Sequence, residues 1–314
     1  MSPIKVGISS CLLGEPVRYN GGHRRDPFLS EVLGRFFTYV PVCPEVECGL
    51  SVPRESMRLR GSAEAPRLVT LKTGVDCTEQ MKAWAVRRLE QLRSEGLCAF
   101  IFKYDSPSCG QFRVKLYGEK ECQGRHTAGI WARAFTEAFA GLPVEEDGRL
   151  HNPAIRENFI ERVFALKRFR DEAGQAPSAA ALVRFQTRNK LLIMAHSPAA
   201  VAELGRLVAG AKVDPVETAR IYEIRLLAAL AETATVPRQV NVLQHMQGYF
   251  KEHLTAAERK EMEGIIRDYQ KELVPLIAPI TLFKHFISRY GIRYLARQTY
   301  LNPHPPELKL RNHA

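Results

Sequence analysis

The residues Ile4-Lys5-Val6-Gly7-Ile8-Ser9-Ser10-Cys11-Leu12-Leu13-Gly14 decide the fold of the N-terminal half of the chain. The apolar start predicts a buried strand, and the glycine at the end suits a sharp turn after it. Three more stretches have strand character, Phe37–Val42, Leu97–Lys103 and a shorter one at Leu68–Lys72. Because helical stretches alternate with these runs, we expect an α/β domain with a Rossmann-like parallel sheet.

Helices are predicted around this sheet from their apolar spacing. One follows Leu68–Lys72 and is expected to open with Asp76 and Glu79 in capping-box spacing, and another begins near Thr127. The stretch Asn152–Phe169, with Pro153 in its first turn, is expected to close the first domain.

The second half lacks strand patterns and has helical spacing almost throughout. Asp171–Ser178 mixes acidic residues with Gly and Pro, so we place the boundary there and predict domains at residues 1–170 and 175–314. The second domain is expected to be all-α, with Thr255 and Glu258 forming a capping box. Its predicted helices are Leu182–His196, Pro198–Ala209, Pro215–Glu232, Val240–His253, Ala256–Leu273, Ile280–Tyr290 and Ile292–Tyr300.

Composition limits the class of protein. With 314 residues, 45% hydrophobic and 25% charged residues, the chain is of ordinary globular composition and long enough for two domains. No apolar run approaches the roughly 20 residues of a membrane span, and the first residues enter a strand without a secretory signal, so we expect a cytoplasmic protein. A net charge of +11 indicates attraction to nucleic acid, although solubility alone also explains such a charge.

Seven cysteines, an odd number, argue against a disulfide framework. Cys11, Cys43 and Cys109 each follow a predicted strand, and the carboxyl ends of parallel strands meet at one edge of a sheet. Three converging thiolates without an equally placed histidine fit an iron–sulfur cluster better than a catalytic zinc ion, which stays possible.

Cys48 is a candidate fourth ligand because it lies on the same loop as Cys43. Three ligands would leave one iron open to act as a Lewis acid toward a substrate sulfur, whereas four would favour a structural or electron-transfer centre. Cys77, Cys98 and Cys122 do not follow a strand in this way.

Several motifs surround these cysteines: Ser9–Gly14, Arg18–Gly21, Cys43–Val46, Gly49-Leu50, Pro53-Arg54 and Ser106–Gly110. With them, roughly residues 1–165 resemble the thiouracil desulfidase (TudS-like) family. The second half contains Met194–Ser197, His245–Lys251, Val274–Leu276 and Gln298–Leu301, and with these motifs it is similar to the YbgA-like domain. The pairing resembles the architecture of RudS-like tRNA 4-thiouridine desulfidases.

The resemblance implies a 4Fe-4S cluster on Cys11, Cys43 and Cys109, with Cys48 not a ligand. It also implies a catalytic glutamate at Glu45 and a catalytic serine, for which Ser106 is the better match and Ser108 the second. The implied reaction removes sulfur from 4-thiouridine in tRNA to give uridine. Two other functions remain open: a desulfidase of free thiouracil, and a nonenzymatic iron–sulfur protein that binds RNA or acts as a sensor.

The residues support a hydrolytic mechanism in which the open iron polarises the thiocarbonyl and Glu45 activates the attacking water. Ser106 would hydrogen-bond that base or pass a proton to the ring. Cations expected to hold phosphate or ribose near the site are Arg18, Arg24, Arg25, Arg54 and Lys103.

The helical domain is expected to bind the body of the tRNA through cations interleaved with aromatic residues. The cations are Arg184, Arg188, Lys190, Lys251, Lys284, Arg289, Arg293 and Arg297, and the aromatic residues are Phe185, Tyr249, Phe250, Tyr290, Tyr294 and Tyr300. The sequence does not determine the oligomeric state.

Overall fold

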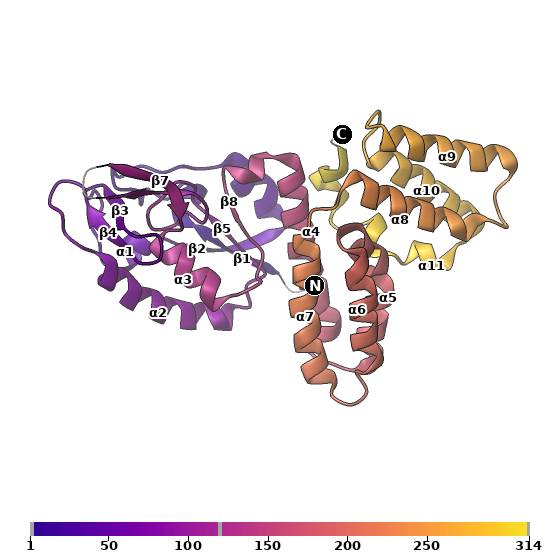
Figure 1. Cartoon of the computed structure of the whole chain (residues 1–314), viewed down its shortest axis with the longest axis horizontal. Coiled ribbons are helices and arrows are strands. Elements are labelled where there is room, and N and C mark those ends of the chain that lie inside the picture. The colour runs from indigo at the N-terminus through magenta and orange to yellow at the C-terminus, as the bar shows by residue number, and fades with distance from the viewer. Residues whose placement is uncertain (1–2, 119–120, 313–314) are drawn as a thin grey trace. The chain divides into compact units, whose positions relative to one another are not determined.

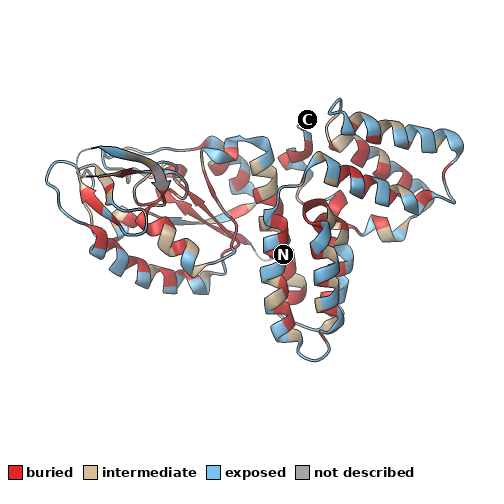
Figure 2. Cartoon of the chain, viewed as in Figure 1, coloured by how far each residue is buried: buried red, intermediate tan, exposed pale blue. Residues whose placement is uncertain are grey.

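Strand β1 (Ile4–Ser9) lies inside a four-stranded parallel sheet, as the opening stretch predicts. The order is β2-β1-β5-β8, with β2 at Phe37–Val42, β5 at Ala99–Phe102 and β8 at Val144–Glu146. Each neighbouring pair is parallel, so the carboxyl ends of these strands share one edge. β5 is buried along its whole length, which explains its continuous apolar run (Figure 2).

Helices α2 (Thr78–Glu95) and α3 (Ile130–Ala138) pack together beside this sheet (Figure 1). The ring centroids of Trp84 and Trp131 are 4.9 Å apart, and those of Phe100 in β5 and Phe135 in α3 are 4.5 Å apart. A Cβ at Gly7 of β1 would lie only 2.2 Å from the Phe100 ring, so the strand needs glycine there.

The expected strand at Leu68–Lys72 exists, but its place in a parallel sheet is wrong. It forms β4 (Pro66–Thr70), which pairs antiparallel with β3 (Met57–Gly61) in a second, mixed sheet of order β4-β3-β6-β7. The other strands of that sheet are β6 (Val114–Tyr117) and β7 (Cys122–Thr127). An apolar run does not specify its partner, and here a short hairpin returns the chain beside β3.

The start of α2 also differs from the prediction. Cys77 occupies the N-cap position and makes no side-chain cap, while Oδ1 of Asp76 accepts hydrogen bonds from the amide and hydroxyl of Thr78. The predicted pairing of Asp76 with Glu79 is therefore wrong, because the carboxylate of Asp76 is used one residue earlier in a local turn.

The structure, a computed structural model, describes residues 3–118 and 121–312, and the chain forms two compact units, Met1–His151 and Asn152–Ala314. The second unit begins with α4 (Pro153–Phe169), capped by the Asn152 side chain. The expectation that this helix closes the first domain is thus wrong. Its buried face packs on α7 (Pro215–Ala231), and so its contacts belong to the second unit.

The described part of the second unit consists of helices and turns, which matches the all-α prediction (Figure 1). Thr255 and Glu258 form the predicted capping box at the start of α9. The remaining helices are α5 (Ala179–His196), α6 (Pro198–Ala209), α8 (Val236–Gln247), α9 (Ala256–Gln270), α10 (Ile277–Tyr290) and α11 (Arg293–Ala296). Within the described ranges, every helix is too short or too polar to cross a bilayer.

Candidate active site

A cavity of about 240 Å³ lies in the first unit where β1, β2 and β5 end, and Cys11, Cys43 and Cys109 all line it. Cys11 sits in a short 3-10 helix, η1 (Ser10–Leu13), directly after β1. Cys43 is the N-cap of α1 (Pro44–Glu47), directly after β2. Cys109 is on the loop that follows β5. The structure thus brings together the three thiols that the sequence singled out.

The loop that carries Cys109 is fixed by the first turn of α3. The amide of Trp131 donates to the carbonyl of Ser108 at 3.0 Å, and that of Ile130 donates to the carbonyl of Pro107 at 3.2 Å. A Cβ at Gly129 would lie 2.4 Å from the carbonyl oxygen of Ser108, so only glycine permits this approach. The loop is therefore held rigidly at the cavity wall.

Burial makes the three thiols poor acids when nothing positive lies beside them. It raises the pKa of Cys11 to about 12, assisted by the charge of the Cys43 thiolate. Burial likewise raises the pKa of Cys43 and, well above its usual value, that of Cys109. Three thiolates at this place require a positively charged centre, which is what a metal cluster supplies.

The spacing of the thiols favours a cluster over a single metal ion. In the described ranges, one group of three ligating side chains has its ligand atoms within 4.8 Å of one another, and it is Glu157, Glu161 and His304. Sulfurs bound to one zinc ion at about 2.3 Å would meet that limit, because they lie at most about 4.6 Å apart. The sulfurs of Cys11, Cys43 and Cys109 do not all lie within that limit, which suits a cubane with ligands at separate corners better than one zinc ion.

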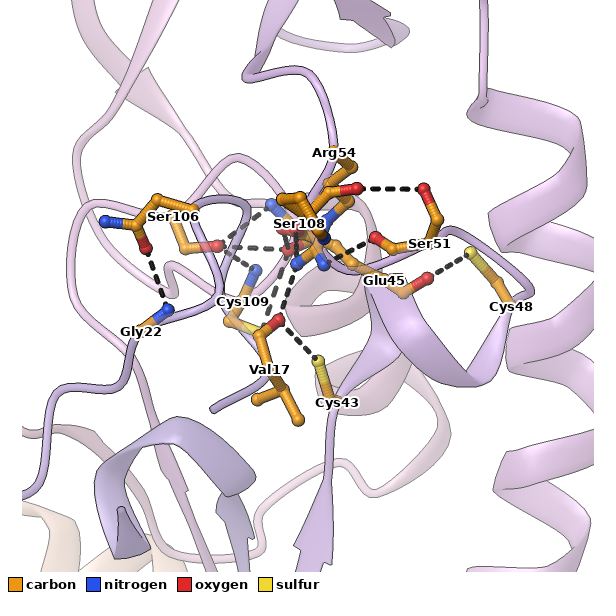
Figure 3. A network of polar contacts seen from close by, with 12 residues as sticks. Val17, Gly22, Cys43, Glu45, Cys48, Ser51, Arg54, Ser106, Ser108 and Cys109 are labelled. Atoms are coloured by element: carbon orange, nitrogen blue, oxygen red, sulfur yellow. Dashed lines mark hydrogen bonds and ion pairs between the residues drawn. The ribbon is translucent and has the colours of Figure 1, made fainter. Parts of the chain in front are cut away.

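Cys48 does not line this cavity. Its thiol donates to the main-chain carbonyl of Glu45 at 3.3 Å, and the side chain lies apart from Cys43 and Cys109 (Figure 3). The arrangement agrees with the implication that Cys48 is not a ligand.

Glu45 and Ser108 meet in the cavity wall (Figure 3). The Ser108 hydroxyl donates to Oε1 of Glu45 at 2.6 Å and lies 3.0 Å from the hydroxyl of Ser106. Oγ of Ser106 accepts the amide proton of Cys109 at 3.1 Å. The serine in contact with Glu45 is therefore Ser108, the second match of the sequence motif, while Ser106 extends the chain of hydroxyls.

The side chain of Arg54 points inward, whereas the sequence suggested that it contacts a phosphate. Its side chain is 7% exposed, and both its Nε and Nη2 donate to Oε2 of Glu45, the Nε at 2.8 Å. Nη2 also donates to the carbonyl of Val17 at 2.9 Å. These contacts use the guanidinium to hold Glu45 in place.

The other predicted cations divide into two groups. Arg18 and Lys103 line the cavity, and Lys103 also pairs with Asp147 at 2.8 Å. Arg24 and Arg25 are exposed and do not line it, and Arg25 pairs with Glu31 at 3.0 Å. The main chain of this segment stays beside the site, since the amide of Arg24 donates to the carbonyl of Cys11 at 2.9 Å, but both arginine side chains lie outside the cavity lining.

Tyr19 and Tyr104 are among the lining residues to which the sequence assigned no role. Each directly follows a predicted cation, Arg18 or Lys103, and this adjacency was the available signal. Exposure could not be read from the sequence, because a tyrosine after a strand is as often core as surface.

The model of the 2-thiouracil desulfurase family matches residues 6–147, and that of DUF1722, a family of unknown function, matches residues 190–305.

Two curated relatives match well. The uncharacterized protein YbgA of Escherichia coli (strain K12) is 30% identical over 160 residues, which are 50% of this chain and 94% of YbgA. The uncharacterized protein YbbK of Bacillus subtilis (strain 168) is 32% identical over 108 residues, 33% of this chain and 71% of YbbK.

Among solved structures, the 4Fe-4S-dependent thiouracil desulfidase TudS is 27% identical, with a TM-score of 0.40, over 50% of this chain and 99% of TudS. The family predicted from the sequence motifs is confirmed by the two family models and the YbgA relative. The chain belongs to the family in which a 2-thiouracil desulfurase domain precedes a DUF1722, or YbgA-like, domain.

Proposed function

We propose that this chain is an iron–sulfur-dependent desulfidase that replaces the sulfur of 4-thiouridine in tRNA by oxygen, giving uridine. The observation that carries the proposal is that three thiols and the Glu45–Ser108 pair line one cavity. The TudS relative is 4Fe-4S-dependent and acts on thiouracil, which supports the same cofactor and a thiolated pyrimidine here.

Cys11, Cys43 and Cys109 would hold the 4Fe-4S cluster. When bound, such a cluster supplies an iron that acts as a Lewis acid toward the thiocarbonyl sulfur. The reaction as a whole is hydrolytic: the C=S group and water give C=O and hydrogen sulfide, and no electron is gained or lost.

Glu45 serves as the general base. Its Oε2 is held by Arg54 and its Oε1 by the Ser108 hydroxyl, so the carboxylate is oriented within the cavity that a water would enter. The proton that it takes can pass through the hydroxyls of Ser108 and Ser106, which lie 3.0 Å apart, toward the leaving group or the ring nitrogen.

We propose that the second unit binds the tRNA body. Its folded structure excludes several of the aromatic residues that the sequence suggested as RNA contacts. Phe185, Phe250 and Tyr300 are fully buried and belong to the core, so they are removed from the list of possible RNA contacts. Tyr249 is 38% exposed and stacks on Tyr294 with centroids 5.0 Å apart. Arg293 and Arg297 are exposed on the neighbouring helix end. This group is the better candidate for bases and phosphates.

The direct test is anaerobic incubation of the purified chain with thiolated tRNA, followed by nucleoside analysis. We expect 4-thiouridine to be lost and uridine to appear in equal amount. Glu45→Ala should keep the brown colour of the cluster and lose turnover. Full activity of Glu45→Ala would remove this residue from the mechanism.

A desulfidase of free thiouracil is the second candidate, favoured by a cavity small enough for a single base. Truncation after His151, where the first unit ends, distinguishes a tRNA desulfidase from a desulfidase of free thiouracil. If tRNA is the substrate, the truncated chain should still act on thiouracil but be impaired on tRNA. Equal rates on tRNA before and after truncation would contradict a role of the second unit in tRNA binding.

A further inference from the structure

Two exposed tyrosines line the active-site cavity. Tyr19 is 42% exposed and Tyr104 is 40% exposed. In the described ranges Tyr249 is the one other tyrosine of this exposure, so two of three belong to a single cavity. An exposed aromatic ring leaves apolar surface in water, which a flat ligand stacked on it would cover.

A cationic side chain from the preceding residue lies over each of these rings. Cζ of Arg18 lies 5.5 Å from the centre of the Tyr19 ring, and Nζ of Lys103 lies 5.7 Å from that of Tyr104. Both cations also line the cavity. A ring beside a positive charge, repeated on two separate segments, suits a ligand in which a base is joined to a phosphate.

Both tyrosines are tied to the reacting part of the site through their main chain. The amide of Arg54, whose side chain pairs with Glu45, donates to the carbonyl of Tyr19 at 2.7 Å. The amide of Tyr104 donates to Oδ1 of Asp147 at 2.6 Å, and Asp147 also holds Lys103. The positions of the two rings relative to Glu45 are therefore set by hydrogen bonds.

The reacting groups lie deep in the cavity. Ser108 is fully buried, and the Glu45 side chain is 14% exposed. A cavity of about 240 Å³ has no room for a base that is still stacked in a helix. A base within a polynucleotide must leave its stack to reach Glu45, and it then needs new stacking partners.

We propose that Tyr19 and Tyr104 form the stacking subsite for the extruded thiolated base, and that Arg18 and Lys103 bind the phosphate attached to it. The assignment rests on the proposed function and names the residues that make the site select nucleotides over free bases.

Binding of sulfur-free ligands tests the subsite separately from catalysis. We would measure affinities of uridine 5′-monophosphate and uridine for the full chain, purified anaerobically, by titration calorimetry. Tyr19→Leu and Tyr104→Leu should each weaken both ligands about tenfold, since stacking on one ring contributes roughly that much. Tyr19→Phe and Tyr104→Phe should bind like the wild type, because they keep the ring.

The charges are tested in the same titrations. Arg18→Gln should weaken uridine 5′-monophosphate about tenfold and leave uridine unchanged. Lys82→Gln, which removes an equal charge from the exposed face of α2, is the matched control and should change neither ligand. With thiolated tRNA as substrate, the leucine variants should raise KM and keep kcat within about twofold.

Unchanged affinity in both leucine variants would overturn the subsite, as would phenylalanine variants that bind as weakly as leucine variants. Failure of the proposed function looks different. A wild-type chain that does not desulfurate any thiolated substrate, yet loses uridine monophosphate binding in the leucine variants, would refute the reaction and support the subsite.

Discussion

The hydroxyl of Ser108 donates to Oε1 of Glu45 across 2.6 Å, although the two residues are 63 positions apart in the chain. Ser108 follows β5 and Glu45 follows β2, so the bond joins two loops at the same edge of the parallel sheet. The contact identifies the serine that acts directly on the proposed base.

The first prediction separates the two serines. Ser108→Ala removes the hydroxyl that orients Glu45, and kcat for a thiolated pyrimidine should fall about 100-fold. Ser106→Ala leaves that bond in place, so a smaller loss, about tenfold, is expected from the shortened proton path. Single-turnover rates with thiouracil measure both. A larger loss in Ser106→Ala than in Ser108→Ala would show that Ser106 carries the essential hydroxyl.

The second prediction concerns the cluster ligands. Cys11→Ala, Cys43→Ala and Cys109→Ala should each abolish the brown colour and the turnover, because each removes one corner ligand. Cys48→Ala is the matched control, since its thiol bonds the Glu45 carbonyl outside the cavity. Iron and sulfide analysis of anaerobically purified protein measures the outcome. Loss of iron in Cys48→Ala would assign that thiol to the cluster instead.

The third prediction treats Arg54 as a positioning residue. Arg54→Met leaves the mostly buried Glu45 carboxylate without its ion pair, so kcat should fall at least about tenfold while the colour is kept. Arg54→Lys keeps the charge but not the two-pronged contact, and an intermediate rate is expected. A rise in KM for tRNA with unchanged kcat would instead favour the phosphate contact first expected from the sequence.

The fourth prediction is a pH dependence at the start of α9. The amide of Thr255, then the hydroxyls of Tyr290 and Thr255, lower the pKa of Glu258 to about 2. A carboxyl with a lowered folded pKa stabilises the fold above its unfolded pKa of about 4.5, and that contribution disappears as pH falls toward 2. The protection factor for hydrogen exchange in the first turn of α9, which is the intrinsic rate at each pH divided by the observed rate, should therefore fall over this window.

The matched variants for that experiment are Glu258→Gln and Glu252→Gln. Glu258→Gln should remove most of the pH dependence in the first turn, whereas Glu252→Gln changes an exposed carboxylate outside the capping box and should keep it. The same acid response in both variants would show that other carboxylates control this helix end.

The fifth prediction concerns a buried ion network in the second unit. Glu161 is 2% exposed, and its carboxylate binds Nη2 of Arg311 at 2.8 Å and Nε2 of His196 at 3.0 Å. Arg311 also contacts Glu157 at 3.4 Å, so the guanidinium already supplies the positive charge between these carboxylates. The group holds the C-terminal segment against α4.

Glu161→Gln should lower the free energy of unfolding of this unit by about 3 kcal/mol, because it leaves a buried guanidinium with an incomplete partner. Glu217→Gln breaks the exposed Glu217–Arg220 pair on α7 and should lower the free energy of unfolding far less. Urea unfolding curves give both values. An equal loss of unfolding free energy in the two variants would mean that the buried network stabilises the fold no more than a surface ion pair does.

Local patterns predicted the elements whose signal is strong in the sequence. β1 and β2 were placed to the residue, because β1 is a mostly buried apolar run and β2 is rich in aromatic and β-branched residues. The capping box of Thr255 and Glu258 was also predicted, since it depends on residues three positions apart. The short strands β3, β6, β7 and β8 were missed because three to six residues carry little periodicity.

The domain boundary shows a different limit. Asp171–Ser178 has the composition of a linker, but it forms a turn of the second unit, and the division falls at His151 and Asn152. Composition reports where a chain is polar and flexible, whereas a boundary depends on which neighbours a helix packs against.

By itself the sequence determined that three cysteines follow strands of one sheet, and a parallel sheet must bring such residues to one edge. Tertiary structure alone decided that Ser108 bonds Glu45, that Arg54 faces inward, that Cys48 stands apart, and that Tyr19 and Tyr104 stay exposed. The physical reason is that a local apolar run marks where a strand lies in the sequence, whereas strand partners and the direction of a loop side chain depend on contacts between segments far apart in the chain.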